Sequence, residues 1–512
     1  MTIHSSHCAD LTLVIDQGSH ASRIALFSKT GEQIYLKSQT ISTHLTTSKQ
    51  PVFEQNAQEI LQSILSLLNN VPDNLSAKIK CAGLCTQRST VVAWHKMSGK
   101  PLSPAISWRD TRSQPLINKL STHAKKIRKI SGLPLSAHYS AGKIHWLLNN
   151  CPEVKLAAKD RQLCIAPLAS YLLFHLLNEK PCIVDHSNAQ RSQLFDSQRL
   201  NWSSELLQLF QIEPHILPDC VPVIYHYGHL HLNNIALCAV VGDQNAALYA
   251  YPALTENNAL VNIGTGAFVL SPAPGQNDEN LKLLHTLSSS DEKEANFVTE
   301  GTVNGAGAAL SWAQENDPVN IISAHNAPKD DLFTQLPGWL KQVKSPPVFI
   351  NTIAGLGSPW WCNAGEPEFI GEGKHLQANR YVAIIESIVF LIVKNIQQLN
   401  AQPETLFLSG GLSQLDTLCQ KLADLSQITV QRFNTTEATA RGCAWLANQI
   451  CQGNQENQTG LANQTFNNNH MSWQALQVSQ QFQPSDFDDE AIEIQKRYQQ
   501  FVGELNRRCT SD

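Results

Sequence analysis

Several signals that identify common protein classes are absent from this chain of 512 residues. Charged residues make up only 16% and the formal net charge is −5, so no overall positive charge favours binding to nucleic acid. The apolar stretches are far shorter than the roughly 20 residues that span a bilayer. The first ten residues hold neither the basic nor the apolar region of a secretory signal. We therefore expect a cytoplasmic protein that binds neither membrane nor nucleic acid.

The cysteines lack the spacing of a metal or disulfide site. There are 13 of them, they are scattered, and no C-x-x-C pair occurs. Zinc sites and disulfide frameworks are normally visible as such spacings. Neither is expected here, and most of the cysteines should be small buried hydrophobes.

Two nucleotide-binding signatures are also missing. The chain has no G-x-x-x-x-G-K-[ST] phosphate loop and no G-x-G-x-x-G dinucleotide motif. A nucleotide, if one binds, must be held by a different fold. Apolar residues reach 42%, which is enough for extensive cores, and the length predicts two or more domains or one very large domain.

The chain opens with a pattern of strand, turn and strand. Apolar residues 11–15 lead into Asp16-Gln-Gly-Ser19, and a second apolar run follows at 23–27. Turn residues between two such runs predict a hairpin. Further elements are expected as strands at 33–40, 79–84 and 90–94 and a helix at 59–68, where apolar residues recur at helical spacing.

The opening pattern returns about half a chain later. A strand at 258–262 leads into Gly264-Thr265-Gly266 and a strand at 268–270. Such an internal repeat predicts two related lobes. Other expected elements are a loop at 355–359 before a helix at 381–399, a strand at 405–408, a glycine turn at 409–413 that opens another helix, a polar linker at 452–470 and a terminal helix within 487–505.

The glycine and hydroxyl turns that follow apolar strands are typical of phosphate binding, because glycine lets backbone N–H groups approach an anion. Two acids lie where strands meet turns, Asp16 and Asp243. Strand ends in α/β folds open onto binding crevices, and phosphoryl transfer needs both a metal-binding group and a group that positions the nucleophile. The alternative is that either aspartate only caps a turn.

With these segments in hand, the sequence resembles the FGGY family of carbohydrate kinases, and the glycerol kinases most of all. The resemblance covers about residues 11–448 and keeps the family order. Its segments are Val14–Gly18, Thr86–Ser89, Ser98–Pro101, Ala105–Trp108, Asp185–Phe195, Gly242–Ala246, Gly264–Gly266, Gly355–Pro359 and Gly410-Gly411. It implies an α/β fold of two ribonuclease-H-like lobes of the actin and sugar-kinase superfamily, with an active-site cleft between them.

The resemblance also implies roles for individual residues. Asp243 matches the catalytic base, which takes the proton of the attacked hydroxyl, and Asp16 matches the aspartate that holds Mg²⁺. Residues expected around the substrate are Arg88, Ser89, Trp108, Asp110, His138, Tyr139, Asp243, Gln244 and Phe268. Residues expected around ATP are Ser19, His20, Arg23, Gly264, Thr265, Gly266, Gly307, Ser311, Gly410, Gly411 and Leu412. Without the resemblance, Arg88 would be read as an ion-pair residue and Trp108 as a core residue.

Several positions depart from the glycerol kinase pattern. Ser89 stands where an acid usually follows Gln-Arg, and His138-Tyr139 replaces a tyrosine-phenylalanine pair. Arg109-Asp110-Thr111-Arg112 is closer to the ketose kinases of the family. Because serine is shorter than glutamate, the substitution leaves room for a longer substrate, and we expect a pentulose or a short polyol in preference to glycerol.

The nucleotide side also differs from the family pattern. Leu415 replaces an expected asparagine, Cys362 an expected aspartate, and His20 a threonine that commonly faces phosphate. The nucleotide preference is therefore left open at this point. His20 is expected to be a neutral polar contact.

Two functional hypotheses follow. The first is an active kinase that uses ATP and Mg²⁺ to phosphorylate a small sugar or polyol, and the rival is an inactive or weakly active relative that binds a sugar or nucleotide as a sensor. The lobes are expected at residues 1–247 (substrate and first phosphate turn) and 248–450 (nucleotide), followed by a polar linker and helix at 451–512. The resemblance is compatible with a homodimer.

Overall fold

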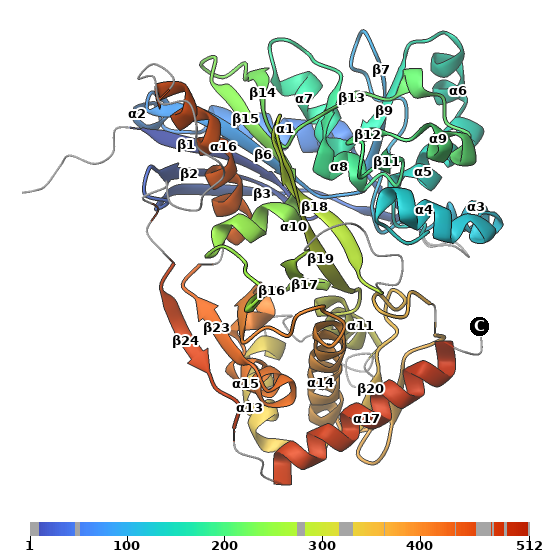
Figure 1. Cartoon of the computed structure of the whole chain (residues 1–512), viewed down its shortest axis with the longest axis vertical. Coiled ribbons are helices and arrows are strands. Elements are labelled where there is room, and N and C mark those ends of the chain that lie inside the picture. Colours follow the sequence, from blue (N-terminus) through green and yellow to red (C-terminus); the bar gives the residue numbers. More distant parts are fainter. Residues whose placement is uncertain are drawn as a thin grey trace, which may run out of the picture. The chain divides into compact units, whose positions relative to one another are not determined.

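The computed structural model describes residues 10–46, 52–273, 282–316, 331–362, 364–435, 437–456, 473, 476–485 and 489–509 (Figure 1). The chain divides into two compact units. Unit 1 comprises Met1–Ala253, Thr286–Phe297 and Glu437–Ala475, and unit 2 comprises Leu254–His285, Val298–Thr436 and Leu476–Asp512. The sequence-based division at residues 247 and 450 concerned the roles of the lobes and stays a prediction, whereas the compact units are each assembled from separate stretches of chain.

Unit 1 contains a six-stranded sheet in the order β14-β15-β6-β1-β2-β3. The strands are β1 (Leu11–Gln17), β2 (Ala21–Ser28), β3 (Gln33–Thr40), β6 (Ile79–Thr86), β14 (Ile224–His229) and β15 (Ala236–Gly242). β1 is antiparallel to β2 and parallel to β6, which is parallel to β15. The carboxyl ends of β1, β6 and β15 therefore meet at one edge, where Gln17, Thr86 and Gly242 lie in a single row of the register.

The central strand β1 is buried along its whole length, as its continuous apolar run requires of a strand covered on both faces. Helix α16 (Ala438–Glu456) contacts β1, β6 and β15. It also approaches α10 (Asp243–Ala247) closely, because a Cβ at Gly442 would collide with the carbonyl oxygen of Ala246. The absence of a side chain at Gly442 thus lets α16 support the element that begins at Asp243.

A second sheet of unit 1 has the order β4-β5-β8-β7-β9. Its strands are β4 (His44–Thr46), β5 (Val52–Gln55), β7 (Val91–His95), β8 (Ala105–Ile106) and β9 (Leu163–Pro167). The chain passes from β6 of the first sheet to β7 of the second through Gln87–Thr90. This connection therefore joins the two sheets of unit 1.

Helices complete unit 1. They are α1 (Ala57–Asn69), α2 (Asp73–Ser76), α3 (Gln114–Lys119), α4 (Ala124–Ser131), α5 (Ser140–Asn150), α6 (Pro152–Lys159), α7 (Leu168–Leu176), α8 (His186–Gln190) and α9 (Ser204–Phe210). The start of α5 is fixed by two backbone hydrogen bonds, from Ser140 N to Arg191 O at 3.5 Å and from Ala141 N to Ser192 O at 2.8 Å. This places the first turn of α5 beside the segment that follows α8.

The second large sheet has seven strands in the order β18-β19-β17-β16-β22-β23-β24. The strands are β16 (Asn258–Ile263), β17 (Ala267–Pro272), β18 (Leu284–Ser290), β19 (Ala295–Val303), β22 (Thr405–Ser409), β23 (Thr429–Phe433) and β24 (Val478–Phe482). Most of β18 and the first three residues of β19 belong to unit 1, and the other strands belong to unit 2. β16 is antiparallel to β17 and parallel to β22, which is parallel to β23.

The two large sheets share one topology. In each, a hairpin (β1–β2 or β16–β17) is extended on one side by an antiparallel strand (β3 or β19) and on the other by two parallel strands (β6 and β15, or β22 and β23). An antiparallel strand follows at the far edge, β14 or β24. The internal repeat predicted from the sequence is therefore confirmed at the level of strand order.

Helices of unit 2 are α11 (Gly307–Asn316), α13 (Asp331–Gln342), α14 (Gln377–Ile396), α15 (Asp416–Ser426) and α17 (Asp489–Cys509). The longest buried run is that of α14, which contacts α13, α15 and α17. The sequence predicted a helix at 381–399 and a terminal helix within 487–505, and α14 and α17 confirm that a helix occurs at each place. The predicted linker at 452–470 was wrong for residues 452–456, which continue α16, and its remainder lies outside the described residues.

The prediction that no disulfide forms is corrected by a bond between Cys362 and Cys509, which are 147 residues apart. It ties the end of α17 to the loop before β21 (Glu368–Ile370), both in unit 2. A pair so distant leaves no spacing in the sequence that could reveal it. The bond also accounts for a cysteine at position 362, where the family pattern has an aspartate. No helix in the described part of the chain is long and apolar enough to cross a membrane.

Candidate active site

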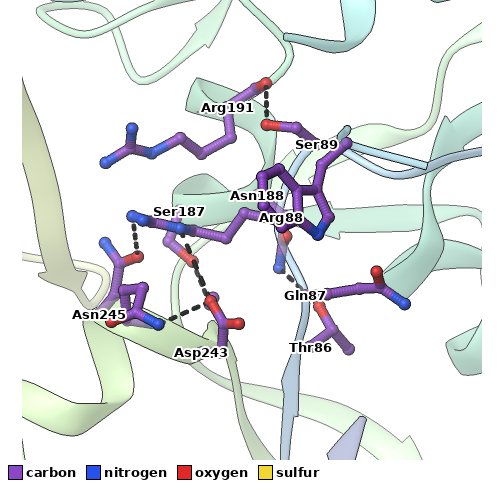
Figure 2. A network of polar contacts seen from close by, with 12 residues as sticks. Thr86, Gln87, Arg88, Ser89, Ser187, Asn188, Arg191, Asp243 and Asn245 are labelled. Atoms are coloured by element: carbon purple, nitrogen blue, oxygen red, sulfur yellow. Dashed lines mark hydrogen bonds and ion pairs between the residues drawn. The ribbon is translucent and has the colours of Figure 1, made fainter. Parts of the chain in front are cut away.

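Asp243 is the first residue of α10 and follows directly on β15. Its side chain is 25% exposed, and its Oδ1 lies 3.7 Å from Nε of Arg88 (Figure 2). Burial raises the pKa of Asp243 to about 6, against the opposing effect of Arg88, and Asp16 raises it further. The edge of the sheet thus holds a carboxylate that takes up and releases a proton close to neutral pH.

A buried polar network fixes the backbone at this edge (Figure 2). Gly242 N donates to Ser187 Oγ at 2.9 Å, and Ser187 Oγ in turn donates to Asp185. Asn188 Nδ2 donates to Asp185 Oδ2 at 2.8 Å and to Thr86 Oγ1 at 3.4 Å. Asp185 caps the short helix α8. This helix therefore connects the ends of β6 and β15 and fixes the backbone position from which Asp243 starts α10.

Arg88 is held from two sides. Its NH1 donates to Asn245 Oδ1 at 3.0 Å, and Asn245 itself donates to Leu287 O at 2.5 Å. Gln87, the preceding residue, is buried and donates to the side-chain oxygens of Gln17 and Gln55 at 3.1 and 2.9 Å. The guanidinium is only 9% exposed, so its direction is set by the protein rather than by solvent. The structure thus brings Arg88 and Asp243, both expected around the substrate, close together.

The side chains of Trp108, His138 and Tyr139 form an aromatic wall in unit 1. The rings of Trp108 and His138 are 5.4 Å apart, and those of His138 and Tyr139 are 5.2 Å apart. Trp108 Nε1 donates to Ser19 Oγ at 2.9 Å, which ties the wall to the turn after β1. Burial lowers the pKa of His138 well below its usual value, with further lowering by Lys143, Arg191 and Arg88, so this ring is neutral near pH 7.

Ser89 is fully buried, and its backbone has a φ of 64°. Its hydroxyl donates to the carbonyl oxygen of Arg191 at 3.2 Å (Figure 2). The position of the usual family acid is therefore occupied by a small, internally bonded side chain. It links the β6–β7 connection to the segment after α8.

Asp110 has a different environment from the substrate contact that the sequence predicted. It is fully buried, and its carboxylate accepts from Phe53 N at 2.8 Å and from Arg112 Nε and NH2 at 2.9 and 2.8 Å. Burial opposes ionisation, but these hydrogen bonds outweigh it and lower the pKa of Asp110. This geometry favours a role in positioning the loop after β8, and the direct substrate contact receives no support from it.

Gln244 has a buried Oε1 without a hydrogen-bond partner among the described residues. Its backbone N–H donates to Asp243 Oδ1 at 2.7 Å. A buried amide oxygen is normally paired. A donor from a bound molecule, such as a sugar hydroxyl, would satisfy this one and fits the predicted substrate contact.

Asp16 is the last residue but one of β1 and is 3% exposed. Burial raises its pKa, Arg23 NH1 at 3.1 Å opposes this, and Glu437 raises it further. A cation would relieve this crowding of negative charge. No cluster of three or more ligating side chains occurs in the described residues.

His20 lies in the turn between β1 and β2, and its side chain is largely exposed. Partial desolvation of its ring, together with the charge of Arg109, lowers its pKa. A neutral imidazole is expected at neutral pH, as predicted. Arg23 on β2 is 39% exposed and pairs with Asp16. Ser19, His20 and Arg23 are thus gathered around one turn of unit 1.

The second phosphate turn belongs to unit 2. Gly264-Thr265-Gly266 joins β16 to β17, and its carbonyl groups cap α11, since Gly307 N donates to Gly264 O and Ala308 N to Thr265 O, each at 2.9 Å. A Cβ at Gly307 would lie 2.8 Å from the Gly264 carbonyl oxygen, so only glycine permits this approach. Ser311 is exposed one turn later on α11, and Phe268 lies on β17 beside the same turn.

The third turn follows β22. Gly410 has a φ of 89°, and a Cβ there would collide with the carbonyl oxygen of Ile263 at the end of β16. At Gly411 a Cβ would meet nothing within 4 Å. Leu412 and Leu415 are buried in the core of unit 2, so a nucleotide contact by Leu412 would involve its backbone only.

Some residues of the site were given no role by the sequence. Asn245 directs Arg88, Arg191 accepts from Ser89, and Lys143 lies buried behind the aromatic wall. Each is an ordinary polar residue within a helix or turn, and only the folded backbone brings it to the site. Glu437 acts electrostatically on both Asp16 and Arg23 and raises the pKa of each.

Comparisons with known proteins agree on one family. Residues 11–242 match the N-terminal domain of the FGGY family of carbohydrate kinases, and residues 259–450 match its C-terminal domain. A glycerol kinase of Mycoplasma genitalium is 29% identical over 462 residues, which cover 86% of this chain and 89% of the relative.

Solved structures show the same fold. Plasmodium falciparum glycerol kinase with ADP matches with a TM-score of 0.79 and 22% identity over 98% of this chain and 97% of that one. A xylulose kinase from Lactobacillus acidophilus matches with a TM-score of 0.78 and 17% identity over 97% and 98%. Both likenesses establish the two-domain α/β fold of the sugar kinases.

Proposed function

Because the chain belongs to the FGGY family of carbohydrate kinases, enzymes that transfer a phosphoryl group to an alcohol, we propose that it transfers the γ-phosphoryl group of ATP to a hydroxyl of a small sugar or polyol, with Asp243 as the general base. The observation that carries this proposal is the carboxylate of Asp243 at the end of β15, with a pKa of about 6, held 3.7 Å from Arg88. A general base works best when its pKa lies near the operating pH.

Asp243 would accept the proton of the attacking hydroxyl as the oxygen approaches the γ-phosphorus. Near neutral pH most of this carboxylate is ionised, since its pKa is about 6. Because the transition state of phosphoryl transfer is loose, most of the catalytic gain comes from positioning and charge stabilisation. The network from Asp185 through Ser187 to Gly242 supplies that positioning, since it fixes the backbone from which Asp243 projects.

The acceptor would be bound by hydrogen-bonding side chains and by aromatic rings. Arg88 offers guanidinium N–H donors to neighbouring hydroxyls, Gln244 offers its buried Oε1 as an acceptor, and Trp108 with His138 offers an apolar face to the carbon chain. A ligand with hydroxyls along one edge and C–H groups on its face matches this set. Small sugars and polyols have that form.

Each unit contains a turn suited to binding phosphate oxygens. In unit 1, Ser19 lies in the turn after β1 and Arg23 lies on β2. In unit 2, Gly264–Gly266 forms the turn between β16 and β17, next to the first turn of α11. Magnesium bound to the phosphates of ATP would neutralise the charge that develops on them, and Asp16 is the residue that would hold it, through water. Glycine at 411 leaves open space for the adenosine part.

We propose a pentulose or a four- or five-carbon polyol as the acceptor. Ser89 is small and bonded internally, so it cannot supply the charged contact that a glutamate would give a short triol. The neutral ring of His138 would offer the acceptor an uncharged polar contact at another position.

A kinetic panel tests this proposal. Purified protein with ATP and Mg²⁺ would be assayed for ADP release with pentuloses, four- and five-carbon polyols and glycerol, with an acceptor-free blank. We expect kcat/KM to be highest for a pentulose or a longer polyol. A strong preference for glycerol would overturn the substrate assignment. Nucleotide binding without acceptor-dependent ADP release would instead support the rival sensor function.

A further inference from the structure

Lys143 is the fourth residue of α5 and has no exposed surface. Its ammonium donates to three backbone carbonyl oxygens, those of Ser89 at 3.2 Å, Trp108 at 3.4 Å and His138 at 2.5 Å. An ammonium has three N–H donors. Each of them can therefore be matched by one of these carbonyls.

The three carbonyls belong to different segments. Ser89 lies in the β6–β7 connection, Trp108 in the loop after β8, and His138 in the loop before α5. Each of the three residues is also expected around the acceptor. Lys143 is thus hydrogen-bonded to all three loops of unit 1 at residues that we expect around the acceptor. These hydrogen bonds are made to main-chain carbonyl oxygens and so do not depend on the side chains of the three residues.

We propose that Lys143 is a positioning residue of the acceptor site, which sets the spacing of the loops that carry Ser89, Trp108 and His138 without touching the substrate. This rests on the proposed function, because it assigns those three residues to the acceptor.

The surroundings of α5 support a fixed position for this ammonium. A Cβ at Gly142 would lie 2.6 Å from Ser113 Oγ, so the glycine lets α5 pack directly against the loop that contains Trp108. Ala141 N donates to Ser192 O at 2.8 Å. The helix start is therefore fastened on both sides of Lys143, and the lysine reaches the carbonyls from a fixed base.

The charge of Lys143 is adjustable near neutral pH. Burial lowers its pKa to about 7, with Asp110 opposing and Arg112 adding to the decrease. His138, whose carbonyl oxygen Lys143 contacts, is neutral because burial, Lys143, Arg191 and Arg88 lower its pKa. Loss of the proton would leave a lone pair facing carbonyl oxygens, and one loop would lose its hydrogen bond.

The acceptor KM is then expected to rise as the pH passes upward through about 7, while the KM for ATP stays level. This limb has the opposite direction to the ionisation of Asp243, which increases activity as the pH rises through about 6. The two effects together predict a bell-shaped profile of kcat/KM for the acceptor.

The test compares Lys143→Met and Lys143→Arg with the wild type. Lys143→Met should raise the acceptor KM about tenfold or more and leave the ATP KM within about twofold. Lys143→Arg keeps a permanent charge and several N–H donors, so it should restore much of the acceptor KM and abolish the loss of activity above pH 7. If Lys143→Met does not fold, the profiles of Lys143→Arg and wild type carry the test.

The matched control is Lys421→Met in unit 2. Lys421 is also buried, but it pairs with Glu386 Oε1 at 3.0 Å and not with acceptor loops. It should lower stability without a selective change in acceptor KM.

Three results would overturn the inference. They are an equal rise of both KM values in Lys143→Met, an unchanged high-pH limb in Lys143→Arg, or the same selective KM change in Lys421→Met. Absence of acceptor-dependent turnover in the wild type would overturn the proposed function instead, and so the two failures are distinguishable.

Discussion

Replacing Asp243 by asparagine should lower activity and raise stability at the same time. The carboxylate is mostly buried, with 25% of its side chain exposed, and its pKa is raised to about 6. An unperturbed aspartate has a pKa near 4. The folded protein therefore binds this proton more tightly than the unfolded chain does.

The sign of the stability effect follows from that difference. A raised carboxyl pKa contributes stability that is fully present below about pH 4 and is lost as the pH rises through about 6. Above that window the ionised carboxylate costs at most about 3 kcal/mol, since each pKa unit corresponds to about 1.4 kcal/mol. Asp243→Asn removes the charge and should recover part of this at pH 7.5.

Loss of the base should reduce kcat by about 10²- to 10⁴-fold, the usual contribution of a general base. Steady-state kinetics at pH 7.5 would measure this, and thermal unfolding at pH 4.5 and 7.5 would measure stability. The variant should melt at a higher temperature than wild type at pH 7.5, with a smaller difference at pH 4.5. Asp160→Asn, an exposed aspartate of unit 1, should change neither quantity.

Two outcomes would refute this reasoning. An Asp243→Asn protein with the kcat of the wild type would remove the base role. A variant that is less stable than wild type at pH 7.5 would show that the buried charge does not oppose folding.

Three further predictions concern the metal, the nucleotide and the disulfide. Asp16→Asn should raise the KM for Mg·ATP about tenfold or more, while the acceptor KM, measured in the same assay, stays close to that of wild type. Gly410→Ala should lower the melting temperature because its φ of 89° and its close approach exclude a Cβ, whereas Gly411→Ala should melt like wild type and lose ATP affinity in calorimetry. Equal melting of the two glycine variants would contradict this. Cys509→Ser removes the disulfide between two cysteines that are 147 residues apart, and should lower the free energy of unfolding by at most about 5 kcal/mol. The melting temperature should fall and should no longer respond to reducing agent. An unchanged melting temperature would mean that this disulfide does not stabilise unit 2.

Much of the fold was predictable because its signals are local. The strand at β1 is one apolar run followed by turn residues, and the same pattern at β16 revealed the repeat that the sheet topology confirms. The acids Asp16 and Asp243 were found for the same reason, since each directly follows or ends an apolar strand. The sequence did not predict that β1, β6 and β15 are parallel neighbours, which brings both acids to one edge of a single sheet.

The parts that could not be predicted depend on contacts between distant segments. The bond between Cys362 and Cys509 has no local spacing to reveal it. Lys143 reads as an ordinary helical lysine, and only the folded loops show that three carbonyls surround it. Asp110 was read as a substrate contact, because the sequence does not show that Arg112 and the backbone of Phe53 occupy its carboxylate.

The central claim is that this protein moves a phosphoryl group from ATP to an acceptor hydroxyl through Asp243. The most direct measurement follows γ-labelled ATP with Mg²⁺ and a pentulose or short polyol, and detects labelled acceptor by mass spectrometry for wild type and Asp243→Asn. We expect a phosphorylated acceptor with the wild type and almost none with Asp243→Asn. Equal product with both proteins, or ATP hydrolysis with no labelled acceptor, would contradict it.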